Sequence, residues 1–245
     1  MSLPTEHSVP QQCRWFSYGT PELLARAASQ AILHAAQQAI GLRGAFRIVL
    51  AGGNSPRLVY EMLREANADW TAWQVYMGDE RCLPPEHAER NSLMAAQAWL
   101  DHVAIPASQI HFIPAELGAD AAAASYSRTL RGTGMFDLVL LGFGEDGHTA
   151  SLFPGHDWGC APDAPNAIAV HDSPKPPPDR VTLSAHRLSM AHQVMFLITG
   201  NSKRQAVKNW LDKADIPVTA IRPENGVDVY IEASLLEAAR APGRS

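Results

Sequence analysis

The chain has 245 residues, of which 46% are aliphatic, aromatic or cysteine and 18% are charged. This composition excludes an intrinsically disordered protein and suits a globular chain that buries one large core, so we expect a single domain over residues 1–245. Twenty basic and 25 acidic side chains give a net charge of −5, which provides no general basic surface for nucleic acid or an anionic membrane.

The N-terminal stretch and the cysteines indicate a cytoplasmic protein. Residues 1–12 lack the basic start and the apolar centre of a signal peptide, and no window holds the roughly 18 apolar residues that span a bilayer. Cys13, Cys82 and Cys160 are widely spaced and form no C-x-x-C pair, so neither a disulfide framework nor a zinc ribbon is predicted. We expect a monomer or a weak dimer.

Strands and helices alternate through the first part of the chain. A short strand at residues 15–16 is followed by a helix from a Thr20 cap to about Arg43. Helical spacing predicts its buried face, formed by Leu23, Leu24, Ala27, Ala31, Ile32, Ala35 and Ile40. Further strands are expected at residues 46–51, 73–77, 111–113 and 136–141, with helices at about 56–63, 91–100 and 120–130 between them.

This alternation predicts the fold class. We expect an α/β, Rossmann-like domain with a mostly parallel, doubly wound sheet and helices on both faces. In such sheets ligands bind at the carboxyl ends of the strands. The polar residues of this chain gather at predicted strand ends, so we expect the functional site there.

The first such strand end is the turn Gly52, Gly53, Asn54 and Ser55. Successive backbone N–H groups and a following helix N-terminus can bind a phosphate, and glycines let it approach closely. The turn is not a P-loop, because G-x-x-x-x-G-K-[ST] is absent, and an ordinary tight connection between a strand and a helix remains the alternative.

Later strand ends add charged candidates. Asp79 and Arg81 follow the strand at 73–77. Residues 156–179 are rich in proline and are predicted to form a long loop over or near the site, with one strand at 167–171. Arg180 opens a strand at 180–184, and Lys203 follows a strongly apolar strand at 192–199. A last strand at 227–231 and a helix at 233–239 complete the pattern, and for each cation a surface ion pair is the alternative role.

The richest strand end is residues 136–155, FDLVLLGFGEDGHTASLFPG. His148 is the best candidate for acid–base chemistry, because histidine titrates near neutral pH, and Asp146 is close enough to orient it. A capping aspartate beside a surface histidine is the alternative. The glycines at 142, 144 and 147 also match G-x-G-x-x-G, but Glu145 and Asp146 would repel a diphosphate, which disfavours a nicotinamide dehydrogenase.

Taken in order, five segments resemble those of the 6-phosphogluconolactonase family. They are LAGGNSP at 50–56, GDERCLP at 78–84 with Asn91, LGFGEDGHTASLFP at 141–154, RVTL at 180–183 and GNSK at 200–203. The resemblance covers nearly the whole chain. Asn54 replaces the usual serine of the glycine turn, and Arg90 stands where serine is common, so contacts to phosphate at these positions are expected from backbone donors and not from the family's usual side chains.

The resemblance implies hydrolysis of 6-phospho-D-glucono-1,5-lactone in the oxidative pentose phosphate pathway, without cofactor or metal. It implies that His148 acts as general base toward water and that Asp146 orients its imidazole. Backbone N–H groups of Gly142, Gly144 and Gly147 are expected to line the oxyanion. The phosphate is expected to bind the turn of Gly52, Gly53, Asn54 and Ser55 together with Arg81, Arg180 and Lys203, while Asp79 and Glu80 bond sugar hydroxyls or Arg81.

Two alternatives remain. One is an enzyme similar to glucosamine-6-phosphate deaminase, in which the segment after the histidine continues toward Phe-Asn-Glu-Pro and supplies a carboxylate for ring opening. Here Phe153 precedes Pro154 at that point, and this favours lactone hydrolysis. The other is a sugar-phosphate-binding regulator that has lost catalysis, which the presence of His148 disfavours.

Overall fold

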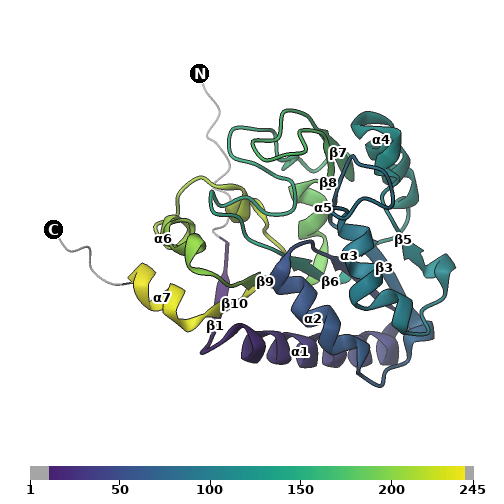
Figure 1. The fold of residues 1–245 in the computed structure, drawn as a ribbon, viewed down its shortest axis with the longest axis horizontal. Coiled ribbons are helices and arrows are strands. Elements are labelled where there is room, and N and C mark those ends of the chain that lie inside the picture. The colour runs from purple at the N-terminus through teal and green to yellow at the C-terminus, as the bar shows by residue number, and fades with distance from the viewer. Residues whose placement is uncertain (1–10, 241–245) are drawn as a thin grey trace.

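Seven strands form one parallel sheet at the centre of the structure, a computed structural model that describes residues 11–240 (Figure 1). The order across the sheet is β1-β10-β9-β6-β2-β3-β5, and every neighbouring pair is parallel. The strands are β1 (Cys13–Tyr18), β2 (Phe46–Leu50), β3 (Trp73–Met77), β5 (Ile110–His111), β6 (Phe136–Leu141), β9 (Ala191–Ile198) and β10 (Val227–Glu232). The predicted doubly wound, mostly parallel sheet is confirmed.

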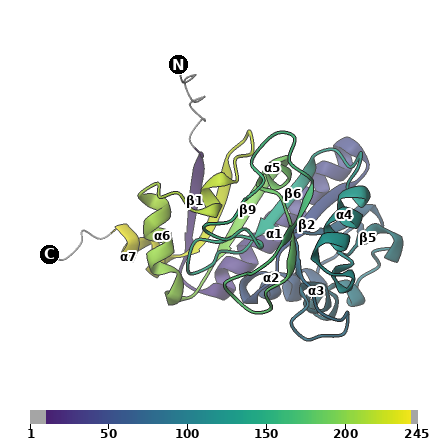
Figure 2. The same ribbon diagram turned by 90° about the horizontal axis from the view of Figure 1, so that it is seen from above.

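Helices flank this sheet on both sides. Figure 2 shows β1, β9, β6 and β2 in this order across the molecule, with β10 between β1 and β9, α6 and α7 beyond β1, and α4 near β5. α1 packs against β2, β6 and β10 and also against α2. The helices are α1 (Pro21–Arg43), α2 (Asn54–Arg64), α3 (Asn91–Ala98), α4 (Ala119–Thr129), α5 (Ala185–Ser189), α6 (Arg204–Leu211) and α7 (Ala233–Arg240).

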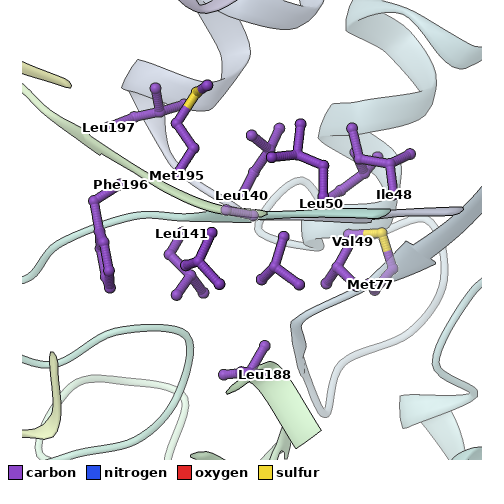
Figure 3. Close-up of a cluster of buried hydrophobic side chains, with 14 of the residues drawn as sticks. Ile48, Val49, Leu50, Met77, Leu140, Leu141, Leu188, Met195, Phe196 and Leu197 are labelled. Carbon is purple, nitrogen blue, oxygen red and sulfur yellow. The ribbon is translucent and has the colours of Figure 1, made fainter. Parts of the chain in front are cut away.

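The central strands are buried on both faces. Ile48 and Leu50 of β2 point to one side of the sheet, whereas Val49 points to the other, where Leu188 of α5 also lies (Figure 3). All four side chains are fully buried. Complete burial of such a side chain contributes roughly 1.5–3 kcal/mol, which explains why these strands read as continuous apolar runs in the sequence.

The long helix α1 begins and ends as predicted, but its buried face is rotated from the predicted one. The Thr20 hydroxyl caps the helix by accepting the N–H of Leu23 at 3.3 Å. Leu23 itself is 52% exposed, and the fully buried stripe is Leu24, Ala25, Ala28, Ser29, Ile32, Ala36 and Ala39. The predicted face was wrong at Leu23 because small alanines, rather than the largest apolar side chains, mark where this helix meets the sheet.

The sequence analysis did not predict the second, smaller sheet, although it predicted two of the three strands that form it. Its strands are β4 (Asp79–Arg81), β8 (Arg180–Leu183) and β7 (Ala167–Val170), and both pairs are antiparallel. The strands expected at 167–171 and 180–184 therefore exist but lie outside the main sheet, and β4, which directly follows Gly78, was not expected. The three residues of β4 are polar and show no alternation of hydrophobic and polar side chains. This strand forms only because β8, far away in the sequence, pairs with it.

The two glycine-rich strand ends meet at the middle of the main sheet. From β2 the chain adds β3 and β5 on one side, and from β6 it adds β9 and β10 on the other. Adjacent strands at which the winding direction reverses leave a crevice at their carboxyl ends, where ligands bind in open α/β sheets. A Cβ built on Gly142 lies 3.6 Å from the carbonyl oxygen of Gly52, so the two turns lie side by side in that crevice.

The buried apolar residues of 11–240 form one continuous core. Within that range, no helix combines the length and the hydrophobicity that crossing a membrane requires. Residues 1–10, on which most of the signal-peptide argument rests, lie outside the described part of the chain.

Candidate active site

A cavity of about 320 Å³ opens at the carboxyl ends of β2 and β6. This volume suits a small metabolite. The cavity brings together most of the site residues predicted from the sequence, namely Gly52, Gly53, Asp79, Arg81, Gly142, Gly144, His148, Arg180 and Lys203. It also contains residues that the sequence analysis did not assign to it, chiefly Lys175 and Asn91.

His148 and Asp146 form a hydrogen-bonded pair at this cavity. Nδ1 of His148 lies 2.5 Å from Oδ1 of Asp146, which also accepts the backbone N–H of His148 at 3.2 Å. The imidazole packs against the ring of Phe153, with centroids 4.8 Å apart. Nε2 has no hydrogen-bond partner in residues 11–240, so this nitrogen is free for a ligand or water.

The electrostatics of the pair favour a neutral imidazole beside an ionised carboxylate. Burial lowers the pKa of His148 below its ordinary value, although the negative charge of Asp146 opposes the shift. Burial alone would raise the pKa of the Asp146 carboxyl, but the contacts with His148 outweigh it and lower that pKa. At neutral pH, His148 can therefore accept a proton, and Asp146 can hold the tautomer with Nδ1 protonated.

Gly144 is required by the position of the histidine ring. A Cβ at this residue would lie 2.0 Å from Nδ1 of His148 and 2.2 Å from its Cε1. The turn is closed by two further bonds, from the N–H of Gly144 to the His148 carbonyl at 2.8 Å and from the N–H of Gly147 to the Gly144 carbonyl at 3.2 Å. In this conformation the N–H groups of Gly144 and Gly147 thus donate within the turn, and the oxyanion site expected from Gly142, Gly144 and Gly147 stays a prediction.

The glycine turn after β2 offers its backbone to the cavity. Gly52 and Gly53 line it, whereas Asn54 and Ser55 do not, and the Ser55 hydroxyl bonds the Thr199 hydroxyl at 2.7 Å. Gly53 is the N-cap of α2, and no side chain caps the helix. The first N–H groups of α2 are therefore available to an anion, while side-chain contacts from Asn54 and Ser55 to a phosphate have no support in this geometry.

Asp79 is held in place by neighbours that the sequence analysis did not connect with it. Its Oδ2 accepts the Ser151 hydroxyl at 2.6 Å, and its Oδ1 accepts Nδ2 of Asn91 at 3.2 Å. Asn91 approaches so closely that a Cβ at Gly52 would lie 2.0 Å from its Oδ1. Asn91 stood in the family pattern, but only the folded chain places it against both Asp79 and the glycine turn.

Glu80 has a different position from the expected one. It is fully buried, and its carboxylate accepts the backbone N–H groups of Asn91 and Ser92, each at 2.8 Å, as well as that of Arg81 at 2.8 Å. It also lies 3.2 Å from Nε of Arg90. Glu80 therefore fixes the start of α3 and cannot bond a sugar hydroxyl.

Arg90, which departs from the family pattern, does not line the cavity. It is buried, and besides Glu80 it contacts Glu116 at 3.3 Å and the carbonyls of Leu83 and Ile113. The substitution of arginine for serine at this position supports α3 and the adjacent loops.

The cations of the cavity fall into two groups. Arg180 donates to the carbonyls of Lys175 and Pro176 at 3.0 Å and of Pro177 at 3.2 Å, and Arg81 donates to the carbonyl of Glu89. Arg81 and Arg180 are thus anchored on paired positions of β4 and β8. Lys203, at the turn after β9, forms no salt bridge within the described residues, and burial lowers its pKa.

Comparison with known proteins identifies the family. The sequence model of the glucosamine-6-phosphate isomerases and 6-phosphogluconolactonases matches residues 19–230. The chain belongs to this family.

Within residues 11–240, no three His, Cys, Asp or Glu side chains gather closely enough to hold a metal ion.

Relatives in the family carry lactonase names. The chain is 34% identical over 234 residues to 6-phosphogluconolactonase of Mycobacterium leprae, covering 89% of this chain and 94% of the relative. It is 32% identical over 239 residues to probable 6-phosphogluconolactonase 3, chloroplastic, of Oryza sativa subsp. indica, covering 86% and 71%.

Solved structures of the family have the same fold. The 6-phosphogluconolactonase of Thermotoga maritima superposes with a TM-score of 0.81 at 25% identity, covering 90% of this chain and 98% of the other. A monomeric glucosamine-6-phosphate deaminase superposes with a TM-score of 0.77 at 18% identity, covering 93% and 99%. The second likeness concerns the fold alone, so the residues of the site have to separate the two activities.

Proposed function

We propose that this chain hydrolyses 6-phospho-D-glucono-1,5-lactone to 6-phospho-D-gluconate, a step of the oxidative pentose phosphate pathway. The observation that carries the proposal is the pair of His148 and Asp146 beside a cavity that also contains Lys203 and an uncapped helix N-terminus. One side of the cavity thus offers a neutral base, and another offers positive charge for a phosphate. The lactonase names of the relatives agree with this chemistry.

His148 acts as the general base. Its free Nε2 takes a proton from water while the water oxygen attacks the lactone carbonyl carbon, and a tetrahedral oxyanion forms. The oxyanion then collapses, the bond from the carbonyl carbon to the ring oxygen breaks, and the imidazolium returns its proton to that oxygen. Asp146 accepts a hydrogen bond from Nδ1–H throughout, remains ionised, and stabilises the transient positive charge on the imidazolium. Proton transfer of this kind is typically worth about 10²–10⁴ in rate.

The phosphate binds at the opposite part of the cavity. The backbone of Gly52 and Gly53 and the N-terminus of α2 supply N–H donors and the positive end of the helix dipole. Lys203 supplies an ammonium group that forms no salt bridge in the described residues, while Arg81 and Arg180 supply positive charge anchored on backbone carbonyls. Asp79, held by Ser151 and Asn91, is placed to accept a sugar hydroxyl. The chemistry requires no cofactor.

A deaminase-like activity is disfavoured by Phe153. The ring is fully buried, packs against His148, and lies 5.5 Å from the guanidinium carbon of Arg180. A deaminase has its ring-opening carboxylate at this position. Here the position holds an apolar ring, so the chain lacks the acid–base group that ring opening and isomerisation require. The remaining alternative is a regulator that binds a sugar phosphate without catalysis. Such a protein would bind the same ligand but would not hydrolyse the lactone.

Acid release from freshly prepared 6-phosphogluconolactone, followed in a pH-stat and corrected for spontaneous hydrolysis, tests the proposal. The wild type is expected to accelerate hydrolysis, and His148→Ala is expected to lose about 10²–10⁴ of kcat. His102→Ala, an exposed histidine bonded only to the Gln97 carbonyl, is the matched control. Lack of acceleration by the wild type refutes the lactonase, whereas full activity of His148→Ala removes this residue from the mechanism.

A further inference from the structure

The turn that carries His148, residues 142–148, packs against a segment far away in the sequence, residues 210–221. The backbone N–H of Val218 donates to the carbonyl oxygen of Gly147 at 3.3 Å. The side chain of Ile216 lies against Gly147, where an added Cβ would be 2.8 Å from Cδ1 of Ile216. The backbone of this catalytic turn is therefore supported directly before the residue that carries the imidazole.

Trp210 supports the same turn at a second point. Its ring lies 5.5 Å from the ring of Phe143, centroid to centroid, and Phe143 lines the cavity. Trp210 is itself buried and packs edge-on against Phe196 of β9 at 5.0 Å. Residues 210–221, which we call the support segment, thus contact the catalytic turn on both sides of Gly144, the residue that makes room for the His148 ring.

The side-chain amide of Gln11 joins the parts of the support segment. Its Nε2 donates to the carbonyl oxygens of Val218 at 2.9 Å and Ile221 at 2.6 Å, and its Oε1 accepts the indole N–H of Trp210 at 2.8 Å. Both N–H groups and the oxygen of the amide are therefore used, and the partners define which atom is the nitrogen. These partners lie 199 to 210 positions later in the chain, so only the folded protein brings them together.

Loss of this amide would weaken both points of support at once. The carbonyl oxygens of Val218 and Ile221 and the indole N–H of Trp210 would lose their partner, and a buried polar group without a hydrogen bond is costly. Val218 and Trp210 are also the residues that contact Gly147 and Phe143. A shift of the support segment would therefore move the turn, and a misplacement of about 1 Å typically costs about 10²-fold in rate.

We propose that Gln11 is a positioning residue for His148: its amide holds the support segment against the catalytic turn and so keeps the imidazole oriented for proton transfer. The inference rests on the proposed function. Gln11 is not among the residues that line the cavity, so it has no contact with the substrate. Its replacement should therefore act on the chemical step and leave ligand binding nearly unchanged.

Gln11→Met tests the proposal, and Gln109→Met is the matched control. Methionine keeps the length of the side chain and removes the hydrogen bonds of the amide. Gln109 is half-buried like Gln11, and its Nε2 also donates to two backbone carbonyls, those of Thr71 at 2.8 Å and Trp73 at 2.6 Å. These residues lie at the β3–β5 end of the sheet, and none of them lines the cavity. Both variants thus remove comparable bonds, but only Gln11→Met touches the support segment.

Three quantities are measured on the full chain. They are kcat for 6-phosphogluconolactone, Kd for 6-phosphogluconate by isothermal titration, and the pKa of His148 by NMR titration of its imidazole, with His148→Ala to assign the signal. Gln11→Met is expected to lower kcat by about tenfold or more and to change Kd by less than about threefold. Gln109→Met should match the wild type in all three quantities.

The pKa of His148 should rise towards its ordinary value in Gln11→Met. Burial is the main cause of the lowered pKa, and a loosened turn admits water around the ring. The charged groups that also act on this pKa, namely Asp146, Lys175 and Asp79, are present in every variant. A rise in the pKa therefore reports a change in the position and burial of the imidazole, which a general loss of stability would not produce.

A kcat of Gln11→Met within about twofold of the wild type, or an unshifted pKa of His148, overturns the proposal. An equal loss of kcat in Gln109→Met also overturns it, because the effect then follows from lowered stability. If Gln11→Met does not fold, Trp210→Phe replaces it, since this variant removes the indole N–H that Gln11 accepts and keeps a ring against Phe143. Smaller changes in the same directions are expected there, and a wild-type kcat and pKa overturn the proposal.

The pKa measurement separates this proposal from the lactonase itself. If the wild type does not accelerate hydrolysis, the proposed function fails, but the pKa of His148 in Gln11→Met and Gln109→Met still decides whether Gln11 positions the ring. If the wild type is a lactonase and Gln11→Met leaves kcat and the pKa unchanged, only the role of Gln11 fails.

Discussion

The substitution Gly144→Ala tests whether the precise position of the His148 ring matters for catalysis. The backbone at Gly144 lies outside the left-handed region, so alanine adds no conformational strain there. The nearest obstacle is the imidazole, because the new Cβ would lie 2.0 Å from Nδ1, 2.2 Å from Cε1 and 2.6 Å from Cγ. Cβ atoms essentially never approach other heavy atoms within 3.0 Å, so the ring has to move.

The size of the movement sets the expected loss. Restoring even the shortest tolerable contact displaces Nδ1 of His148 by about 1 Å, which disrupts its 2.5 Å contact with Asp146. A misplacement of about 1 Å typically costs about 10²-fold in rate, because the reacting groups leave their near-attack geometry. The phosphate-binding elements lie on other turns, so binding of 6-phosphogluconate is expected to change by less than about threefold.

The assay compares kcat for 6-phosphogluconolactone and Kd for 6-phosphogluconate in the wild type, Gly144→Ala and Gly41→Ala. Gly41 lies in α1, where an added Cβ meets no atom within 4 Å, and alanine there should keep full activity and stabilise the helix slightly. A kcat for Gly144→Ala within threefold of the wild type would refute the reasoning. It would mean that the ring tolerates displacement or that His148 is not the base.

Asp146→Asn removes the negative charge that opposes the effect of burial on His148, so the pKa of the histidine should fall further. The acid limb of the pH profile of kcat/KM should therefore move to lower pH, and the maximal kcat/KM should fall. A pH–rate profile checks this, and an unmoved or upward-moving limb contradicts it. Glu80→Ala is expected to lower the free energy of unfolding by about 3–5 kcal/mol in urea denaturation, because it leaves buried Arg90 and the first N–H groups of α3 without their carboxylate. The control is Glu65→Ala, because Glu65 forms an exposed ion pair with Arg64, and this variant should lower the free energy of unfolding by less than about 1 kcal/mol. Equal losses of unfolding free energy in the two variants would count against the structural role of Glu80.

Local patterns in the sequence were enough for the main sheet and for the pairing of His148 with Asp146, whose catalytic roles stay a prediction. The strands β2, β6 and β9 are apolar runs ended by glycine, so their type and length follow from burial on both faces. The proximity of His148 and Asp146 follows from their separation of two residues in a glycine-rich turn. Predictions from neighbours in the sequence therefore succeeded for these elements, whereas the buried face of α1, also predicted from local spacing, was wrong at Leu23.

Predictions that depend on distant contacts failed or were missing. The three-residue strand β4 exists only because β8, about 100 residues later, pairs with it. The proline-rich segment 156–179 was expected to lie over or near the site, but only the tertiary structure, in which Arg180 holds the Lys175 carbonyl, shows that Lys175 lines the cavity. Glu80 and Asp79 are adjacent polar residues with similar chemistry, yet one is buried under α3 and the other lines the cavity.

The sequence by itself determined the kinds of element, their order and the residue types available for acid–base chemistry and anion binding, because these depend on short-range periodicity and turn chemistry. Only the tertiary structure decided which of those residues share one cavity. The reversal of winding between β2 and β6 brings Gly52 beside Gly142, and the second sheet carries Arg180 and the Lys175 loop over the same strand ends. Side-chain direction and the hydrogen bonds already used inside each turn are long-range properties, and they determine which predicted groups remain free to act.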